Sequence, residues 1–192
     1  MSEQIRSFIA FDMENPKVLT RISQAQTLVV ETGADVKLVE PQNIHVTMRF
    51  LGDISPSMVE KIHEVMKNVE FTAFTIQIRG LGVFPSISYP RVVWAGMTEG
   101  VDQLRNIFNQ LEPQILKLGF PKDAYGFSPH LTIARVRSAR NKQHLSELVT
   151  KRGDFEFGEI KANCLRLKRS QLSPKGPIYS TVHEVCTIEN TK

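Results

Sequence analysis

Residues 44–51 read IHVTMRFL, and a related segment, HLTIARV, occupies residues 130–136. Both contain the pattern His-apolar-Thr-apolar, which begins at His45 in the first segment and at His130 in the second. Branched and aromatic residues are typical of strands, so both segments are predicted to be β-strands. Residues two apart in a strand point to the same face. Each histidine is therefore expected beside its own threonine, with the apolar residues of the motif facing the core.

Helices and further strands are predicted on either side of these two segments. Asn-Pro at 15–16 and Ser-Pro at 55–56 are typical helix starts, and apolar residues at helical spacing follow each pair. A third helix is predicted over 101–118, which Pro113 should kink or split. This order predicts an α+β fold rather than a doubly wound one, as a single pseudo-duplicated, two-lobed domain over residues 1–192. The other predicted strands are 7–11, 71–78, 91–97, 160–167 and 178–188, with a breaker-rich connection at 80–85.

The composition is that of an ordinary globular protein. Hydrophobic residues make up 41% of the 192 residues and charged residues 23%, which argues against a disordered, collagen-like or coiled-coil chain. No apolar run is long enough to span a bilayer and the first residues lack a signal-peptide core, so we expect a cytoplasmic protein. Residues 1–130 carry a net charge of −2 and residues 131–192 a net charge of +6. The basic end is compatible with a polyanionic partner such as nucleic acid, and equally with a well-solvated surface.

The cysteines and the remaining histidines indicate no metal or cofactor site. Cys164 and Cys186 are expected to be buried free thiols of a reducing compartment rather than a disulfide, although they could lie on neighbouring strands. Neither has a second Cys or His at zinc-ligand spacing, and no Gly-rich phosphate loop is present. His63 and His144 are expected to be solvated helix residues. His183 is expected to be a strand residue outside any site, although it could approach one. We therefore expect no metal and no cofactor.

Two histidines in one cavity are suited to phosphoester chemistry without a metal. With an unperturbed pKa of about 6.5, one imidazole can donate a proton to the leaving oxygen while the other activates a water or hydroxyl. The hydroxyls of Thr47 and Thr132 could hold phosphate oxygens, and Arg135 could neutralise charge that grows on the phosphate. For either motif alone the alternative is a polar pair at a sheet edge, and for Arg135 it is a surface strand residue. The occurrence of two matched copies favours catalysis.

Six segments that cover most of the chain carry a family resemblance: 6–11 (RSFIAF), 43–52 (NIHVTMRFLG), 82–86 (GVFPS), 90–96 (PRVVWAG), 129–136 (PHLTIARV) and 172–179 (LSPKGPIY). In these segments the sequence resembles the RNA 2′,3′-cyclic phosphodiesterases, also called 2′-5′ RNA ligases, of the two-histidine phosphoesterase superfamily. The resemblance implies a bilobal α+β fold in which two antiparallel sheets flank a central groove. It also implies helices on the outer faces and both histidine motifs in the groove.

The resemblance also implies a reaction and residue roles. The implied activity is hydrolysis of RNA 2′,3′-cyclic phosphate ends to 2′-phosphates, with His45 as proton donor and His130 as proton acceptor. Thr47 and Thr132 would hold phosphate oxygens, and Arg135 matches the basic residue after the second motif.

Three further features complete what the family implies. Phe8 or Phe11 would stack on the terminal base. The RNA partner ends in a 2′,3′-cyclic phosphate, with tRNA halves as one candidate, and the same site could join RNA ends through a 2′-5′ bond without ATP. Separately, the moderate size and the lack of an obvious apolar surface stripe favour a monomer.

Two kinds of alternative function remain at this point. One is a phosphodiesterase that acts on small cyclic nucleotides or 2′-5′ oligoadenylates. The other is a non-catalytic protein that binds RNA ends through the same groove.

Overall fold

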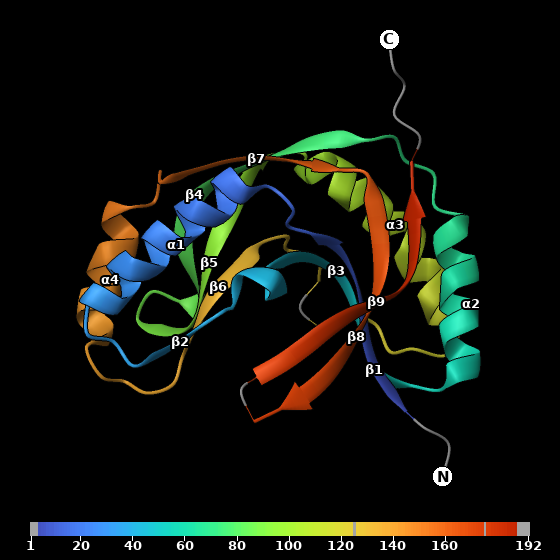
Figure 1. Ribbon diagram of the computed structural model, residues 1–192, viewed down its shortest axis with the longest axis horizontal. Helices are drawn as coiled ribbons and strands as arrows, with labels where there is room; N and C mark the ends of the chain where they lie inside the picture. Colours follow the sequence, from blue (N-terminus) through green and yellow to red (C-terminus); the bar gives the residue numbers. More distant parts are fainter. Residues whose placement is uncertain (1–3, 125, 175, 188–192) are drawn as a thin grey trace.

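All nine strands in the described residues, 4–124, 126–174 and 176–187 of a computed structural model, join in one curled antiparallel sheet (Figure 1). Its order is β7-β4-β5-β6-β3-β1-β8-β9, and β2 pairs with β6 at the side. The strands are β1 (Ile5–Asp12), β2 (Val36–Leu38), β3 (His45–Ile54), β4 (Phe74–Ser86), β5 (Tyr89–Glu99), β6 (Leu131–Val136), β7 (Glu156–Ala162), β8 (Cys164–Ser173) and β9 (Gly176–Cys186). The helices are α1 (Pro16–Glu31), α2 (Pro56–Lys67), α3 (Val101–Lys117) and α4 (Lys142–Lys151), with a 3₁₀ turn η1 (Pro41–Asn43) before β3.

The sheet has two halves that meet between β6 and β3. Helices α1 and α4 pack on the half formed by β7, β4, β5 and β6, whereas α2 and α3 pack on the half formed by β3, β1, β8 and β9 (Figure 1). The predicted α+β class is confirmed. Two separate sheets were expected, but β3 and β6 pair directly at Val46 and Leu131 and make the sheet continuous.

The helix starts follow from their capping residues. The side chain of Asn15 accepts a hydrogen bond from the backbone N–H of Lys17 at 3.0 Å, and that of Ser55 accepts one from Met58 at 3.2 Å. Both satisfy backbone donors that a helix start leaves unpaired, which confirms the two predicted starts. Helix α3 runs without a break through Pro113, so the predicted split is wrong. No helix in the described part of the chain is long and apolar enough to cross a membrane.

Two predicted strand boundaries are wrong because breaker residues lie inside or between strands. The segment 80–85 belongs to β4, where Gly80 has a positive φ of 91° and the register with β5 is irregular. The single strand expected over 160–167 is two strands, β7 and β8, separated at Asn163. The expected turn at 174–177 connects β8 to β9, and its Lys175 lies outside the described residues.

Cys164 and Cys186 form a disulfide, so the expectation of free thiols is wrong. The two residues are directly opposite in the β8–β9 pair, with Cα atoms 4.0 Å apart. The two cysteines are 22 positions apart in the sequence, which hides this proximity. The inference of a reducing compartment from free cysteines therefore loses its support.

A buried ion pair attaches α3 to β3. Arg49 Nε donates to Glu112 Oε2 at 2.6 Å, and both residues are less than a tenth exposed. The other guanidinium nitrogens donate to the carbonyls of Phe50 and Pro121, while Glu112 Oε1 accepts from the backbone N–H of Asp123 at 3.2 Å. The pair therefore also holds the segment that follows α3.

We predict that Glu112→Gln destabilises the protein by about 3–5 kcal/mol, because it leaves the guanidinium of Arg49 buried without a counter-charge. The double variant Arg49→Met/Glu112→Leu should lose less unfolding free energy than the single variants Arg49→Met and Glu112→Leu lose together, because it leaves neither charge buried alone. Urea unfolding measures these free energies. Glu64→Gln, which removes the exposed ion pair with Lys67 on α2, is the control and should have little effect. A Glu112→Gln protein as stable as wild type would contradict the assignment.

Candidate active site

The two histidine motifs meet where the halves of the sheet join. His45 is the first residue of β3, and His130 directly precedes β6. Val46 is opposite Leu131 in this antiparallel pair, and this register sets His45 opposite Thr132 and His130 opposite Thr47. Each imidazole therefore has one threonine beside it on its own strand and another across the pair.

The two motifs have the same pattern of burial over six residues. In 45–50 and in 130–135 the first and third residues are half-buried, the second, fourth and fifth are buried, and the sixth is exposed. The predicted orientation of both motifs is confirmed, because the apolar residues face the core behind the His and Thr side chains. The sixth residue is Phe50 after the first motif and Arg135 after the second. One end of an otherwise matched arrangement is thus aromatic and the other cationic.

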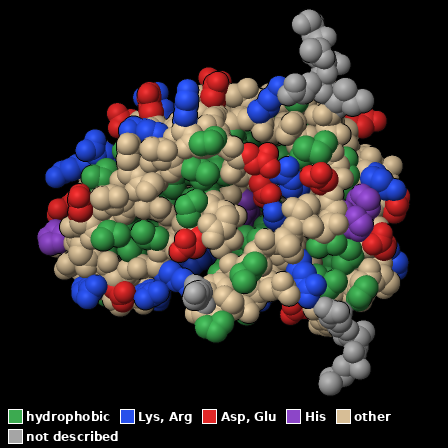
Figure 2. Space-filling view, in the orientation of Figure 1, with side chains coloured by type: hydrophobic (Ala, Val, Ile, Leu, Met, Phe, Trp, Pro, Cys, Tyr) green, Lys and Arg blue, Asp and Glu red, His purple; other side chains and the backbone are tan. Residues whose placement is uncertain are grey.

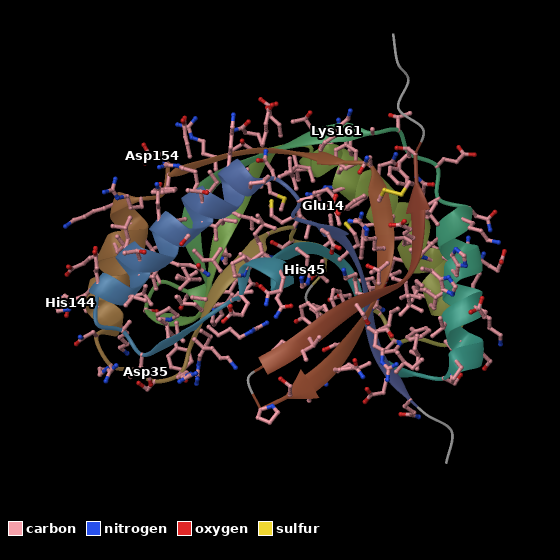
Figure 3. The ribbon with its side chains drawn as sticks, viewed as in Figure 1. Glu14, Asp35, His45, His144, Asp154 and Lys161 are labelled. Atoms are coloured by element: carbon pink, nitrogen blue, oxygen red, sulfur yellow. A yellow bond between two sulfur atoms is a disulfide. The ribbon has the colours of Figure 1, made fainter. Side chains whose placement is uncertain are left out.

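A cavity of about 700 Å³ lies over this junction. Both histidines, both threonines, Phe50 and Arg135 line it, and the β8–β9 hairpin closes one side with Tyr179. His45 is at the centre of the molecule in Figure 3, and the space-filling view shows a hollow there with histidine at its floor (Figure 2). The structure therefore brings five of the predicted site residues into one cavity.

Each imidazole is held by a backbone carbonyl two residues earlier. His45 Nδ1 lies 2.8 Å from the carbonyl oxygen of Asn43, and His130 Nδ1 lies 2.7 Å from that of Ser128. A carbonyl only accepts, so Nδ1 carries the proton and donates in both cases. The remaining nitrogen, Nε2, is the one that can exchange a proton within the cavity.

Burial makes both imidazoles weaker bases than in water. It lowers the pKa of His45 to about 4, against the smaller raising effects of the Asn43 carbonyl and of Asp12. The pKa of His130 is also lowered, first by burial and then by the positive charge of Arg135. Both rings are therefore mostly neutral at pH 7 in the free protein.

Aromatic rings fix the orientation of the two histidines. Phe8 stacks on His45 with ring centroids 4.6 Å apart, and Tyr179 approaches the same imidazole edge-on at 5.4 Å. Phe84 contacts His130 edge-on at 4.9 Å. From the sequence Phe8 is expected only to stack on a base, and Tyr179 is given no role, although Tyr179 falls in one of the segments that carry the family resemblance.

The expectation that Phe8 or Phe11 stacks on a base is corrected by their burial. Phe8 is 3% exposed and Phe11 1% exposed, and Phe11 packs in the core against Phe71 and Phe74. The exposed aromatic ring of the cavity is instead Phe50, with 59% exposure. Its place after the first motif, which matches that of Arg135 after the second, is the sequence signal that could have identified it.

Charged residues behind His45 form a compact network. Asp12 is the register partner of His45, and its carboxylate lies 2.6 Å from Lys168 Nζ. Arg166 Nη1 approaches the same carboxylate at 3.4 Å and that of Glu14 at 2.9 Å. The effects of Asp12 and Lys168 on the pKa of His45 oppose each other, so burial dominates.

The remaining histidines lie outside the cavity. His144 is an exposed residue of α4, as predicted. His63 on α2 and His183 on β9 contact each other through stacked rings, which the sequence did not indicate.

Comparison with known proteins places this chain in a family. Residues 7–186 match the family described as "AKAP7 2'5' RNA ligase-like domain". The RNA 2′,3′-cyclic phosphodiesterase of Aeropyrum pernix is 39% identical over 165 residues, which cover 86% of this chain and 94% of the relative. The enzyme of the same name from Aquifex aeolicus is 37% identical and covers 94% of this chain and 96% of the relative.

Solved structures share the fold. TT0787 of Thermus thermophilus superposes with a TM-score of 0.78 at 25% identity over 95% of this chain and 97% of that one. E. coli LigT complexed with 3'-AMP gives a TM-score of 0.79 at 21% identity, with 96% and 99% coverage. With a family match over nearly its whole length and relatives above 30% identity, the chain belongs to the 2′-5′ RNA ligase-like family of RNA 2′,3′-cyclic phosphodiesterases.

Proposed function

We propose that this protein hydrolyses RNA 2′,3′-cyclic phosphate ends to 2′-phosphomonoesters by metal-independent acid–base catalysis with two histidines. The names of the relatives support cyclic phosphodiesterase activity. The observation that carries the mechanism is the equivalence of His45 and His130. Each is tied through Nδ1 to a carbonyl two residues earlier, which leaves Nε2 as the nitrogen for proton exchange, and both residues line the same cavity.

In the proposed reaction, water attacks phosphorus while Nε2 of His130 takes a proton from that water. The bond from phosphorus to the 3′ oxygen breaks, and Nε2–H of His45 gives its proton to the departing oxygen. The products are a 2′-phosphomonoester and a 3′-hydroxyl. Proton exchange with solvent returns both imidazoles to their starting states.

The other cavity residues would bind the phosphate. The hydroxyls of Thr47 and Thr132 can donate hydrogen bonds to the two non-bridging oxygens, because the strand register sets one threonine beside each histidine. Arg135 has an exposed guanidinium at the same cavity and can stabilise negative charge that grows in the transition state. The asymmetry between Arg135 and Phe50 would fix which way round the RNA end binds.

Substrate binding favours the protonated form of His45, which takes its proton from solvent. The imidazole is mostly neutral in the free protein because burial lowers its pKa to about 4. A cyclic phosphate in the cavity carries a negative charge, and a nearby opposite charge favours the protonated imidazole. The acid form of His45 therefore gains population when substrate is bound.

A 5′-hydroxyl of a second RNA can replace water as the nucleophile. The same proton transfers then form a 2′-5′ phosphodiester and release the same 3′-hydroxyl, so ligation needs no ATP. The bond broken in the cyclic phosphate supplies the driving force. We propose tRNA halves as one class of RNA with suitable ends. Both histidines come from one chain, so the reaction needs no second copy and suits a monomer.

We predict that His45→Ala and His130→Ala each lower kcat about 10²–10⁴-fold, because each removes one proton-transfer group. The assay is hydrolysis of a short RNA with a 2′,3′-cyclic phosphate end in EDTA, with the 2′-phosphate product identified by mass spectrometry. His144→Ala, on the outer surface of α4, is the control. Wild-type turnover that survives either cavity substitution would overturn the mechanism.

Binding and turnover measured over a range of salt concentrations separate the alternative functions. An RNA enzyme should bind its substrate less tightly as salt rises, whereas nucleoside 2′,3′-cyclic phosphates should show a weaker dependence. A wild-type protein that binds the RNA end without turnover would be a binding protein.

The pH dependence of kcat/KM should reflect the lowered pKa values. In the free protein His45 must be protonated and His130 neutral, and both pKa values lie below the usual 6.5. We therefore predict a kcat/KM optimum on the acid side of pH 6.5 that falls as pH rises further. The optimum of kcat should lie at higher pH, since bound phosphate raises both pKa values. A kcat/KM optimum above pH 7 would contradict this assignment.

We further predict that Phe50 stacks on a base of the RNA. Phe50→Ala should raise KM roughly 5- to 150-fold, equivalent to about 1–3 kcal/mol for one stacked base, with little change in kcat. Phe50→Tyr keeps the ring and should retain most of the affinity. Leu116→Ala, at an exposed apolar residue of α3 outside the cavity, is the matched control. An unchanged KM for Phe50→Ala would exclude this contact.

A further inference from the structure

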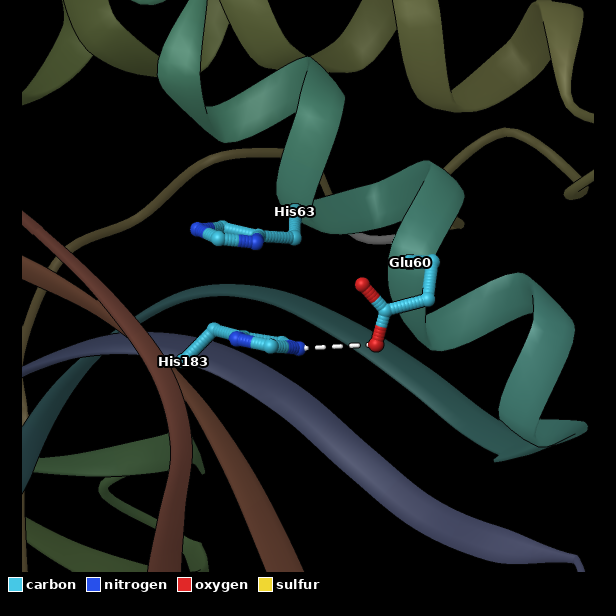
Figure 4. Close-up of side chains that lie close together, drawn as sticks. All are labelled: Glu60, His63 and His183. Carbon is cyan, nitrogen blue, oxygen red and sulfur yellow. Dashed lines mark hydrogen bonds and ion pairs between the residues drawn. The ribbon is translucent and has the colours of Figure 1, made fainter.

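A second group of chemically reactive side chains lies outside the cavity, between α2 and β9. Glu60 and His63 are on α2, three residues apart and hence on one face of the helix, and His183 faces them from β9 (Figure 4). Histidine is at the molecular surface over α2 in Figure 2, and Glu60 has 68% of its side chain exposed. The group is therefore open to solvent.

The three side chains lie close together. One ligand atom from each of Glu60, His63 and His183 lies within 4.8 Å of the others. Nε2 of His183 is 3.0 Å from Oε1 of Glu60, and the rings of His63 and His183 stack with centroids 4.0 Å apart and planes 6° apart. Two imidazoles and one carboxylate thus share a small volume.

We propose that Glu60, His63 and His183 form a binding site for a divalent transition-metal ion of the zinc type. Two imidazoles and one carboxylate are the ligand set that Zn²⁺ accepts, with bonds of about 2.0–2.2 Å and further positions filled by water. The site is separate from the cavity and from the proposed reaction.

The observed distances suit such an ion. Ligand atoms of a tetrahedral zinc site lie about 3.3 Å apart for bonds of about 2.0–2.1 Å. The Nε2–Oε1 distance of 3.0 Å in the His183–Glu60 pair is already close to this value. A carboxylate only accepts, so Nε2 of His183 carries the proton in this pair, and that proton must leave Nε2 before the nitrogen can bind a metal ion.

His63 completes the site by a side-chain rotation. A metal ion lies in the plane of each imidazole that binds it, so two rings in parallel planes cannot share one ion. The half-buried His63 ring is at the surface of α2 and can tilt out of the stack. The neighbouring carboxylate of Glu64 pairs with Lys67 at 2.5 Å and is engaged elsewhere.

The metal ion would cross-link two distant parts of the chain. Glu60 and His183 are 123 residues apart, and β9 is the edge strand of the sheet. The other end of β9 lines the cavity at Gly176 and Tyr179. A bound ion would attach this edge strand to α2 and stabilise the folded protein.

The test uses untagged protein stripped of metal with EDTA and then dialysed. At a free Zn²⁺ concentration 100-fold above Kd, the folding equilibrium constant should rise about 100-fold and Tm by roughly 5–10 °C. Mg²⁺, which prefers oxygen ligands in octahedral geometry, should give no comparable shift. Equilibrium dialysis with elemental analysis should find one Zn²⁺ at this site.

Substitutions locate the ion. His183→Ala and Glu60→Gln should each weaken zinc binding at least tenfold, whereas His144→Ala, at an exposed histidine of α4, should not. Circular dichroism of the variants without metal verifies that they fold. His63→Asn tests the third proposed ligand independently, from the α2 side of the site.

A separate control tests whether the cavity histidines bind the zinc ion. The loss of zinc affinity caused by His183→Ala should be the same in the wild-type protein and in the His130→Ala variant. The proposal is overturned if the protein binds no Zn²⁺, if binding survives His183→Ala, or if binding is lost only in His130→Ala.

Discussion

The pairing of β3 with β6 at Val46 and Leu131 is the contact on which the arrangement of the whole molecule depends. It joins two half-sheets, each covered by its own pair of helices, into one curled sheet. Side chains alternate along a strand, so burying Val46 and Leu131 directs the flanking His and Thr side chains to the opposite face. This one backbone contact thereby joins the two halves of the sheet and places both motifs side by side at the same cavity. A shift of one residue in this register would turn one of the two motifs, with its histidine, into the core.

The site combines a rigid setting with reduced basicity. Carbonyls of Asn43 and Ser128 fix the tautomers, and aromatic contacts from Phe8, Tyr179 and Phe84 fix the ring planes. The same packing removes water from His45 and lowers its pKa to about 4. Orientation and desolvation therefore have one cause. The charge of a bound phosphate is what returns proton-donor character to this imidazole in the proposed mechanism.

The edge strand β9 connects features that are distant in the sequence. One end carries Tyr179 at the cavity, the middle carries His183 against α2, and the far end carries Cys186 in its disulfide with Cys164. Edge strands have one unpaired side, and contacts from outside the sheet are a common means of protecting them. The disulfide and the Glu60–His63–His183 group each hold this strand at a different point.

Local residue patterns determined much of the fold and the centre of the site. The alternation in 45–48 and 130–133 predicted strands with His and Thr on one face, and Asn15 and Ser55 predicted helix starts, because these features depend on near neighbours in the chain. Tertiary structure alone decided the partner of each strand, and with it the Cys164–Cys186 disulfide, the Arg49–Glu112 pair and the grouping of Glu60 and His63 with His183. It also decided that Phe8 supports His45 rather than facing the cavity, and that the pKa of His45 is low. Burial and long-range contact arise only when segments far apart in the sequence pack together, and no local pattern records them.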